Sequence, residues 1–228
     1  MLKALTTDYH TFYEAYLAAL RSSAPVLAQR IADYKYQLLL SNPDPASIRG
    51  GLYVCGLKPY ARRGQVYAFP DAELSPNYQA YLDEQWRTPY VARALQLIRF
   101  VQTELLQQPD DPRRVLLTNW FFQRAEDAAQ LRQIGLKTAH GIPYHRQLLD
   151  YYQPKIVLCV GNGKAQSAYA GMVELHGAKG RKLYDDPYLD RSRLKALRTA
   201  ERLIVGVPHL SRYGVDQRML DWIRELLR

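Results

Sequence analysis

Residues Lys155–Gly161 read KIVLCVG, an uninterrupted apolar run that ends at a glycine. A run this short is typical of a strand buried on both faces, because a helix usually needs about ten residues or more. Three other stretches share its length and character, and we expect a strand in each: Leu52–Leu57, Arg114–Asn119 and Leu203–Val207.

Patterns with a helical period separate the four predicted strands. We predict helices over Asn77–Leu106, Arg124–Ile134, Pro143–Tyr152, Lys164–Leu175, Ser192–Arg202 and Val215–Leu227. Since parallel strands must be joined by crossover connections, apolar strands that alternate with helices favour a parallel sheet covered on both faces. The sequence therefore predicts the α/β class, as a three-layer α/β/α sandwich around a four-stranded parallel sheet.

The first 45 residues contain two further helical patterns. Phe12, Tyr16 and Leu20 fall on one helical stripe, and a second pattern, Val26–Leu40, ends before the turn residues Asn42–Pro45. We expect residues 1–45 to form an N-terminal helical cap on the core. Because no linker-like stretch divides the 228 residues, the sequence indicates a single domain over residues 1–228.

The composition favours a polyanionic partner such as DNA. The formal net charge is +9, and 18 tyrosines accompany the arginines, a combination suited to phosphate contact and base stacking. The two cysteines, Cys55 and Cys159, fall inside predicted strands, so we expect no metal, iron-sulfur cluster or other cofactor. No apolar run approaches the roughly 20 residues that span a bilayer, and no signal-peptide pattern opens the chain. We therefore expect a cytoplasmic monomer without membrane contact.

The loops after the predicted strands are the candidate sites, since ligands of open parallel sheets bind beyond the carboxyl ends of the strands. The first loop runs from Gly56 to Pro70 and places two arginines at its rim. The second begins at Asn119, whose amide can read a base edge or cap the next helix. The fourth, Pro208–Gly214, reads PHLSRYG and holds His209 at a strand end.

The third loop, Gly161–Gln166, looks superficially like a phosphate-binding loop. It fails that pattern because Leu158 and Ala165 replace its first glycine and its hydroxyl residue. We expect a tight turn into a helix, with a DNA phosphate received at the helix N-terminus near Gly163 and Lys164.

Together these loops resemble the motifs of uracil-DNA glycosylases, and the similarity extends over residues 50–228. Gly56–Tyr60 looks like the first motif of that family, and Pro208–Ser211 looks like its final His-Pro-Ser motif with leucine in place of proline. Asn119 matches the base-reading asparagine of the family. Lys58 departs from the pattern, because it replaces the acid or amide that commonly positions the hydrolytic water.

The resemblance implies a role for each matching residue. Asn119 would hydrogen-bond the edge of a flipped base, and His209 would stabilise the negative charge on the departing base. The base would be held by Tyr60, which crowds the pyrimidine 5-position, and stacked by Phe69 or Tyr67. DNA contacts are expected from Arg62, Arg63, Gly163, Lys164, Ser211, Arg212 and Tyr213, with Arg212 or Tyr213 as a wedge in the vacated stack.

Lys58 has three interpretations. It contacts a phosphate, replaces the missing acid electrostatically, or acts as an amine nucleophile that forms a Schiff base with the sugar. We predict a monofunctional DNA glycosylase for uracil or a modified cytosine, including modified cytosines of viral DNA, with a role in genome repair or antiviral defence. The alternatives are a catalytically inactive DNA-binding module of the same fold and a hydrolase of small nucleosides or nucleotides.

Overall fold

The fold is described from a computed structural model. It describes residues 9–32, 49–58, 89–111, 114–123, 125, 127–163, 166–177 and 182–227. The predicted helical residues 33–40 and 77–88 lie outside these ranges.

A six-stranded mixed sheet forms the centre of the described structure. Its strands are β1 Leu52–Gly56, β2 Val115–Asn119, β3 Ile156–Val160, β4 Lys182–Pro187, β5 Arg193–Arg198 and β6 Leu203–Val207. The order across the sheet is β2-β1-β3-β6-β5-β4. The first four of these are mutually parallel, whereas β5 runs antiparallel to β6 and β4 antiparallel to β5.

The α/β class is confirmed, but the prediction of a four-stranded, purely parallel sheet is wrong. The segment Ser192–Arg202, predicted as a helix, contains strand β5. Its leucines, alanine and lysine are good helix formers, yet the backbone pairs with β6, and tertiary pairing overrides local propensity. The other added strand, β4, carries charges and a proline on an exposed edge and therefore has no apolar pattern to reveal it.

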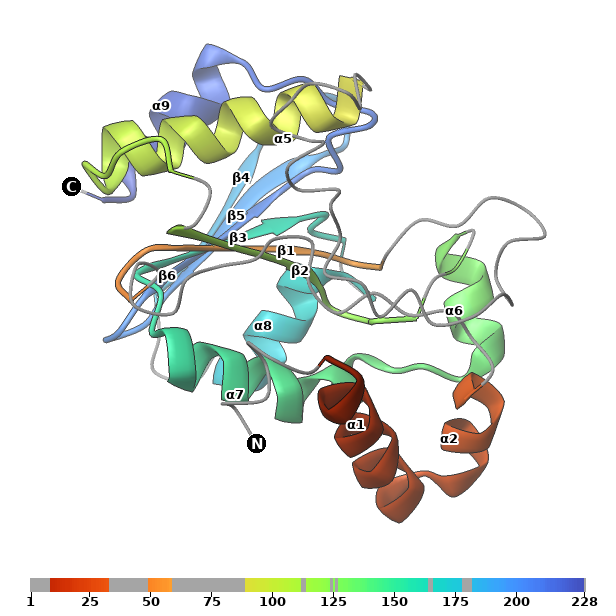
Figure 1. The fold of residues 1–228 in the computed structure, drawn as a ribbon. Helices are drawn as coiled ribbons and strands as arrows, with labels where there is room; N and C mark the ends of the chain where they lie inside the picture. Colours follow the sequence, from red (N-terminus) through yellow and green to blue (C-terminus); the bar gives the residue numbers. More distant parts are fainter. Residues whose placement is uncertain are drawn as a thin grey trace.

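Helices cover both faces of the sheet, so three layers are present (Figure 1). Helices α5 and α9 lie on one face, and α7 and α8 lie on the other, with α1, α2 and α6 beside them. The bounds are α1 Tyr9–Ser23, α2 Pro25–Ala32, α5 Pro89–Phe100, α6 Ala128–Ile134, α7 Ile142–Tyr152, α8 Ala168–His176 and α9 Gln217–Glu225. A π-helical turn, Val101–Leu105, continues α5, and a 3₁₀ turn, Thr138–Gly141, precedes α7.

Two apolar cores result from the alternation of side chains along the strands. In β1, Tyr53 and Cys55 point toward the core shared with α7 and α8, while Leu52 and Val54 point toward the core shared with α5 and α9. Cys159 is the register partner of Cys55, and both are free thiols in the buried sheet. Burial raises the pKa of both thiols, so they remain protonated and serve as small apolar side chains.

The N-terminal helices pack against the α7 side of the sheet. The Tyr16 ring meets the edge of Tyr144 at a centroid distance of 4.4 Å, and the Tyr144 hydroxyl donates to the Tyr16 carbonyl over 3.2 Å. Leu17, Leu20 and Ile31 are also buried there. Helices α1 and α2 therefore extend one of the two cores.

A buried histidine fixes the chain just after β2. His145 donates from Nε2 to the Trp120 carbonyl over 3.0 Å and accepts at Nδ1 from the Tyr53 hydroxyl over 2.5 Å. Its ring also stacks on the Trp120 indole, with centroids 4.2 Å apart and planes 6° apart. Burial lowers the pKa of His145 to about 4, against the weaker raising effect of the bond to Trp120. The imidazole is therefore neutral, and both its nitrogens are satisfied.

Trp120 is held between two glycines, which gives a first testable prediction. A Cβ added at Gly171 would lie 2.3 Å from two atoms of the indole, too close for any real contact. We expect Gly171→Ala to lower the free energy of unfolding by about 2 kcal/mol, since overpacking costs about 1–3 kcal/mol and outweighs the gain in helix propensity. Urea denaturation measures this, with Gly214→Ala as control because a Cβ there meets nothing within 4 Å. Equal stability of the two variants would contradict the tight fit.

Candidate functional site

The loops after the parallel strands are held together at one edge of the sheet. Backbone pairing continues beyond β1 and β2, where Trp120 N–H donates to the Gly56 carbonyl over 2.8 Å and Phe121 N–H to the Leu57 carbonyl over 2.9 Å. The Gly161 N–H likewise donates to the Val207 carbonyl over 2.9 Å. The carboxyl ends of all four parallel strands therefore face one region.

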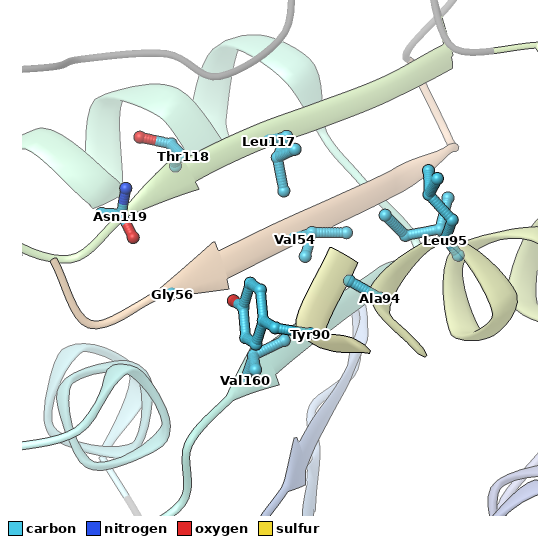
Figure 2. A pocket seen from close by; sticks show the side chains of 10 residues that line it. Val54, Gly56, Tyr90, Ala94, Leu95, Leu117, Thr118, Asn119 and Val160 are labelled. Atoms are coloured by element: carbon cyan, nitrogen blue, oxygen red, sulfur yellow. The ribbon is translucent and has the colours of Figure 1, made fainter. Parts of the chain in front are cut away.

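A cavity of about 30 Å³ lies at this edge, between α5 and the sheet (Figure 2). Its volume corresponds to about one water molecule. Polar groups reach it from the ends of β1 and β2, whereas the deeper wall is apolar. The lining residues are Val54, Gly56, Tyr90, Ala94, Leu95, Ile98, Leu117, Thr118, Asn119 and Val160.

Asn119 is a buried polar side chain that lines this cavity. It is 5% exposed, and its Oδ1 lies over Gly56, where an added Cβ would come within 2.4 Å of that oxygen. None of the described residues forms a hydrogen bond with the Asn119 side chain. The alternative role as a helix cap is wrong, because Asp127 caps the next helix by accepting the Gln130 N–H over 2.8 Å.

His209 follows β6 and has a defined tautomer. The Ser211 backbone N–H donates to Nδ1 over 3.3 Å, and the Ser211 hydroxyl lies 2.7 Å from the same nitrogen. A backbone N–H can only donate, so Nδ1 is the acceptor and the proton of the neutral ring is on Nε2. Within the described ranges this Nε2–H has no acceptor, which leaves it available to a ligand.

Tyr90 connects the surroundings of Asn119 and His209. This residue lies in the first turn of α5, lines the same cavity as Asn119, and stacks on the imidazole of His209 with ring centroids 5.4 Å apart and planes 27° apart. The structure thus brings the Asn119 amide and the His209 imidazole, which are far apart in the chain, to one edge of the sheet. The Tyr90 ring lines the cavity beside Asn119 and stacks on His209.

The electrostatic environment keeps the His209 imidazole neutral. Partial desolvation lowers its pKa first, and the positive charges of Arg212 and Lys58 lower it further. The Lys58 ammonium donates to the Ala125 carbonyl, which ties the loop after β1 to the chain beyond β2. Lys58 therefore contributes positive charge near His209 while its own position is fixed by backbone.

The loop after β3 differs from the prediction. Helix α8 begins at Ala168 and is capped by Ser167, whose hydroxyl accepts the Ala170 N–H over 3.0 Å, so a helix start at Lys164 is wrong. Gly163 is exposed but lies four residues before this cap, so its backbone is not at the helix N-terminus. Its carbonyl accepts from the Ser167 hydroxyl over 2.8 Å.

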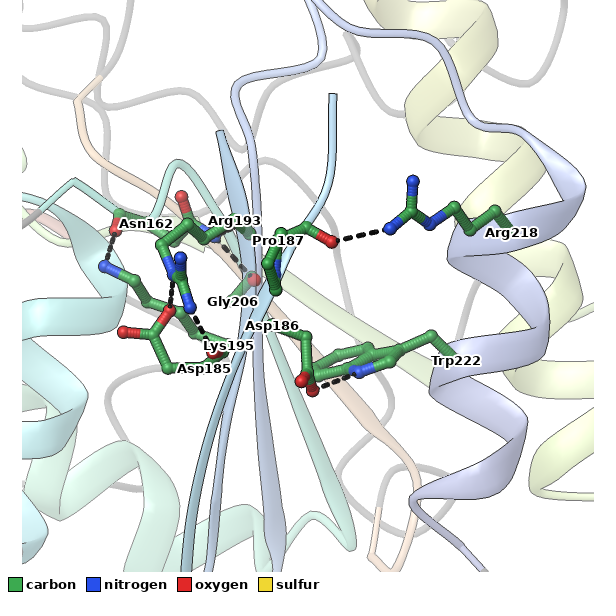
Figure 3. Close-up of polar contacts among 9 residues, drawn as sticks. All are labelled: Asn162, Asp185, Asp186, Pro187, Arg193, Lys195, Gly206, Arg218 and Trp222. Carbon is green, nitrogen blue, oxygen red and sulfur yellow. Dashed lines mark hydrogen bonds and ion pairs between the residues drawn. The ribbon is translucent and has the colours of Figure 1, made fainter. Parts of the chain in front are cut away.

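Asn162 turns inward and joins this loop to the antiparallel strands (Figure 3). Its Nδ2 donates to the carbonyls of Arg193 over 2.6 Å and Gly206 over 2.8 Å. Its own backbone carbonyl accepts from the Lys195 ammonium over 2.9 Å. Asn162 is therefore a structural residue, and Lys195 adds a positive charge to this edge.

Sequence reasoning missed Tyr90, Arg93 and Lys195. Arg93 donates from Nη1 to the Leu210 carbonyl over 2.7 Å and so anchors the turn that carries His209. Tyr90 and Arg93 lie three residues apart in α5, a spacing that places both side chains on one face of the helix. This can be recognised only once the helix bounds are known. The position of Lys195 at this edge was not predicted, because its strand was predicted as a helix.

The remaining predicted site residues divide into two groups. Ser211 and Arg212 are exposed beside His209, whereas Tyr213 is partly buried against the core shared with α5 and α9. The other group lies outside the described residues: Tyr60, Arg62, Arg63, Tyr67, Phe69 and Lys164.

Neither a family model, nor a curated protein, nor a solved structure matches the chain. Among the described residues, no group of three His, Cys, Asp or Glu side chains is arranged to hold a metal ion. Within the same ranges, every helix is too short or too polar to cross a membrane.

Proposed function

We propose that the protein is a DNA glycosylase, a divergent relative of the uracil-DNA glycosylases, which hydrolyses the N-glycosidic bond of a flipped uracil or modified cytosine and leaves an abasic site. The observation that carries this proposal is the Asn119 amide, buried at a cavity without a hydrogen-bond partner among the described residues. An amide that lines a cavity presents a donor and an acceptor to a ligand. The edge of a pyrimidine offers a donor and an acceptor side by side, which matches an amide.

His209 supplies the chemistry expected at the departing base. When the bond between the sugar and the base breaks, the bonding electron pair stays on the base, and water adds to the sugar carbon. The Nε2–H of the neutral imidazole can donate to the base as this negative charge develops, and the charges of Lys58 and Arg212 stabilise it further. Among the described residues that line the cavity none is acidic, so catalysis would depend on leaving-group stabilisation more than on water activation.

The net charge and the rim of the site support a DNA substrate. The chain carries a formal charge of +9, and Arg212 and Ser211 are exposed next to His209. Exposed cations of this kind neutralise phosphates, which fixes the register of DNA without reading its sequence. The same phosphate contacts would hold viral DNA and DNA that needs repair.

The proposal is tested with oligonucleotides that contain uracil or modified cytosines, in single-stranded and duplex form. Alkali-labile sites report base release. We expect Asn119→Ala to lower the single-turnover rate about 10- to 100-fold, since two hydrogen bonds to a base edge are worth about 1–3 kcal/mol. Gln217→Ala, which removes an exposed amide on α9, serves as control and should retain the wild-type rate. Absence of abasic sites with every substrate would reject the proposal.

A second candidate, a catalytically inactive DNA-binding module, is favoured by the bond between Lys58 and the Ala125 carbonyl. A lysine held in this way does not replace the acid that positions water. This candidate predicts salt-dependent DNA affinity without base release, so the same substrates separate the two. A hydrolase of free nucleosides would instead release the base from nucleosides in solution and show no salt-dependent affinity for DNA.

A further inference from the structure

The cavity beside Asn119 is smaller than the ligand that the proposed function requires. It has room for about one water molecule, whereas a pyrimidine base has a six-membered ring and exocyclic groups. The Tyr90 ring is comparable in shape and size to such a base. It lies in the wall of the cavity between Gly56 and Val160, at the ends of β1 and β3 (Figure 2).

Tyr90 also covers the second functional group. Its ring is stacked on His209, the side chain expected to contact the departing base. A base that hydrogen-bonds Asn119 while it receives a proton or hydrogen bond from His209 must lie between these two residues. Tyr90 borders this region, because it lines the cavity together with Asn119 and stacks on His209.

The position of Tyr90 on its helix allows the ring to leave. Tyr90 is the second residue of α5 and is partly exposed. On the same face, Ala94 and Ile98 lie one and two turns further along, and Ile98 is 3% exposed. The later turns therefore hold α5 against the sheet, and a rotation of the partly exposed Tyr90 ring would leave those buried contacts in place.

We propose that Tyr90 closes the base pocket of the unliganded protein and determines which bases enter, because a flipped base must displace its ring from the region between Asn119 and His209. The identity of the ligand as a pyrimidine rests on the proposed function. The exchange replaces one aromatic contact with another, so part of the stacking lost by Tyr90 is regained by the base.

The direct test is binding of free pyrimidines to a variant with an opened pocket. Tyr90→Ala is titrated with free uracil and with free cytosine, and nuclear magnetic resonance follows the Asn119 side-chain amide and the His209 ring. Removing the partly buried Tyr90 ring enlarges the cavity, and an enlarged apolar cavity can bind a ring-shaped ligand. We expect the better of the two probes to bind at least about tenfold more tightly than to the wild type, a change of about 1.4 kcal/mol.

Three further variants make the result specific. Adding Asn119→Ala to Tyr90→Ala should abolish the gained affinity. Tyr151→Ala, which removes a partly buried tyrosine on the opposite face of the sheet, should bind as weakly as the wild type. Tyr90→Leu keeps more apolar cover and replaces the alanine variant if that variant does not fold; it should also gain affinity.

The outcomes separate this inference from the proposed function. If Tyr90→Ala or its leucine substitute binds neither pyrimidine more tightly than the wild type, Tyr90 does not close the pocket, whatever the activity on DNA. If the variant gains affinity that depends on Asn119 while no oligonucleotide releases a base, the role of Tyr90 is supported and the glycosylase proposal is rejected.

Discussion

His209→Ala is expected to lower the single-turnover rate of base release about 10²- to 10³-fold, the effect of removing one donor aimed at developing negative charge. The reason is the tautomer. Because the Ser211 N–H occupies Nδ1, the only ring proton is on Nε2, where a departing base can accept it. The side chain is exposed, so its removal should leave the free energy of unfolding close to that of the wild type.

Two controls distinguish loss of this donor from a general disturbance of the loop. His209→Gln provides a side-chain N–H and should recover part of the rate. His176→Ala, at the end of α8, removes a histidine away from the site and should retain full activity. A rate within about twofold of the wild type for His209→Ala would contradict the assigned role, since that difference amounts to less than about 0.5 kcal/mol.

The stability of the protein is expected to fall between pH 6.5 and pH 4 because of His145. Its pKa is about 4 in the folded chain, against 6.5 for an exposed histidine ring. Between these values the unfolded chain binds more protons, so the free energy of unfolding decreases as the pH falls. The contribution is complete above pH 6.5 and is lost by about pH 4, a difference of roughly 3 kcal/mol.

Urea denaturation at pH 7 and pH 4.5 measures this dependence. His145→Gln is less stable at both values but should lose less stability on acidification than the wild type, since glutamine does not titrate. His140→Gln provides the comparison: desolvation and the charge of Lys137 also lower the pKa of this partly buried histidine, but only His145 is fully buried, so the His145 variant should show the larger change in pH dependence. Identical losses for the wild type and His145→Gln would show that His145 is not the source.

The four parallel strands were predictable because strands buried on both faces read as continuous apolar runs. The predicted and observed bounds coincide for Leu203–Val207 and differ by one residue at one or both ends elsewhere. The antiparallel pair was not predictable in the same way. Strand β5 is made of good helix formers, and only its pairing with β6 imposes the extended backbone.

The site was partly predictable for a geometric reason. Asn119 and His209 both follow buried parallel strands, and such strands end at one edge, so their proximity follows from topology. The contacts of Tyr90 and Arg93 depend on where α5 begins and how it crosses the sheet, which no local pattern encodes. The structural role of Asn162 was not predicted, because its partners, Arg193 and Gly206, belong to strands whose arrangement was unknown.

The antiparallel hairpin of β4 and β5 adds a surface turn that a purely parallel sheet lacks. Its turn, residues 188–192, lies between β4 and β5 at the edge where β6 ends, and the Tyr188 hydroxyl donates to the Gly214 carbonyl over 3.4 Å. A longer turn, or one with a different charge, would change the surface beside the carboxyl end of β6 without altering a parallel strand or a crossover helix. The hairpin is therefore a part of this edge that can vary in length and charge independently of the loops that carry Asn119 and His209.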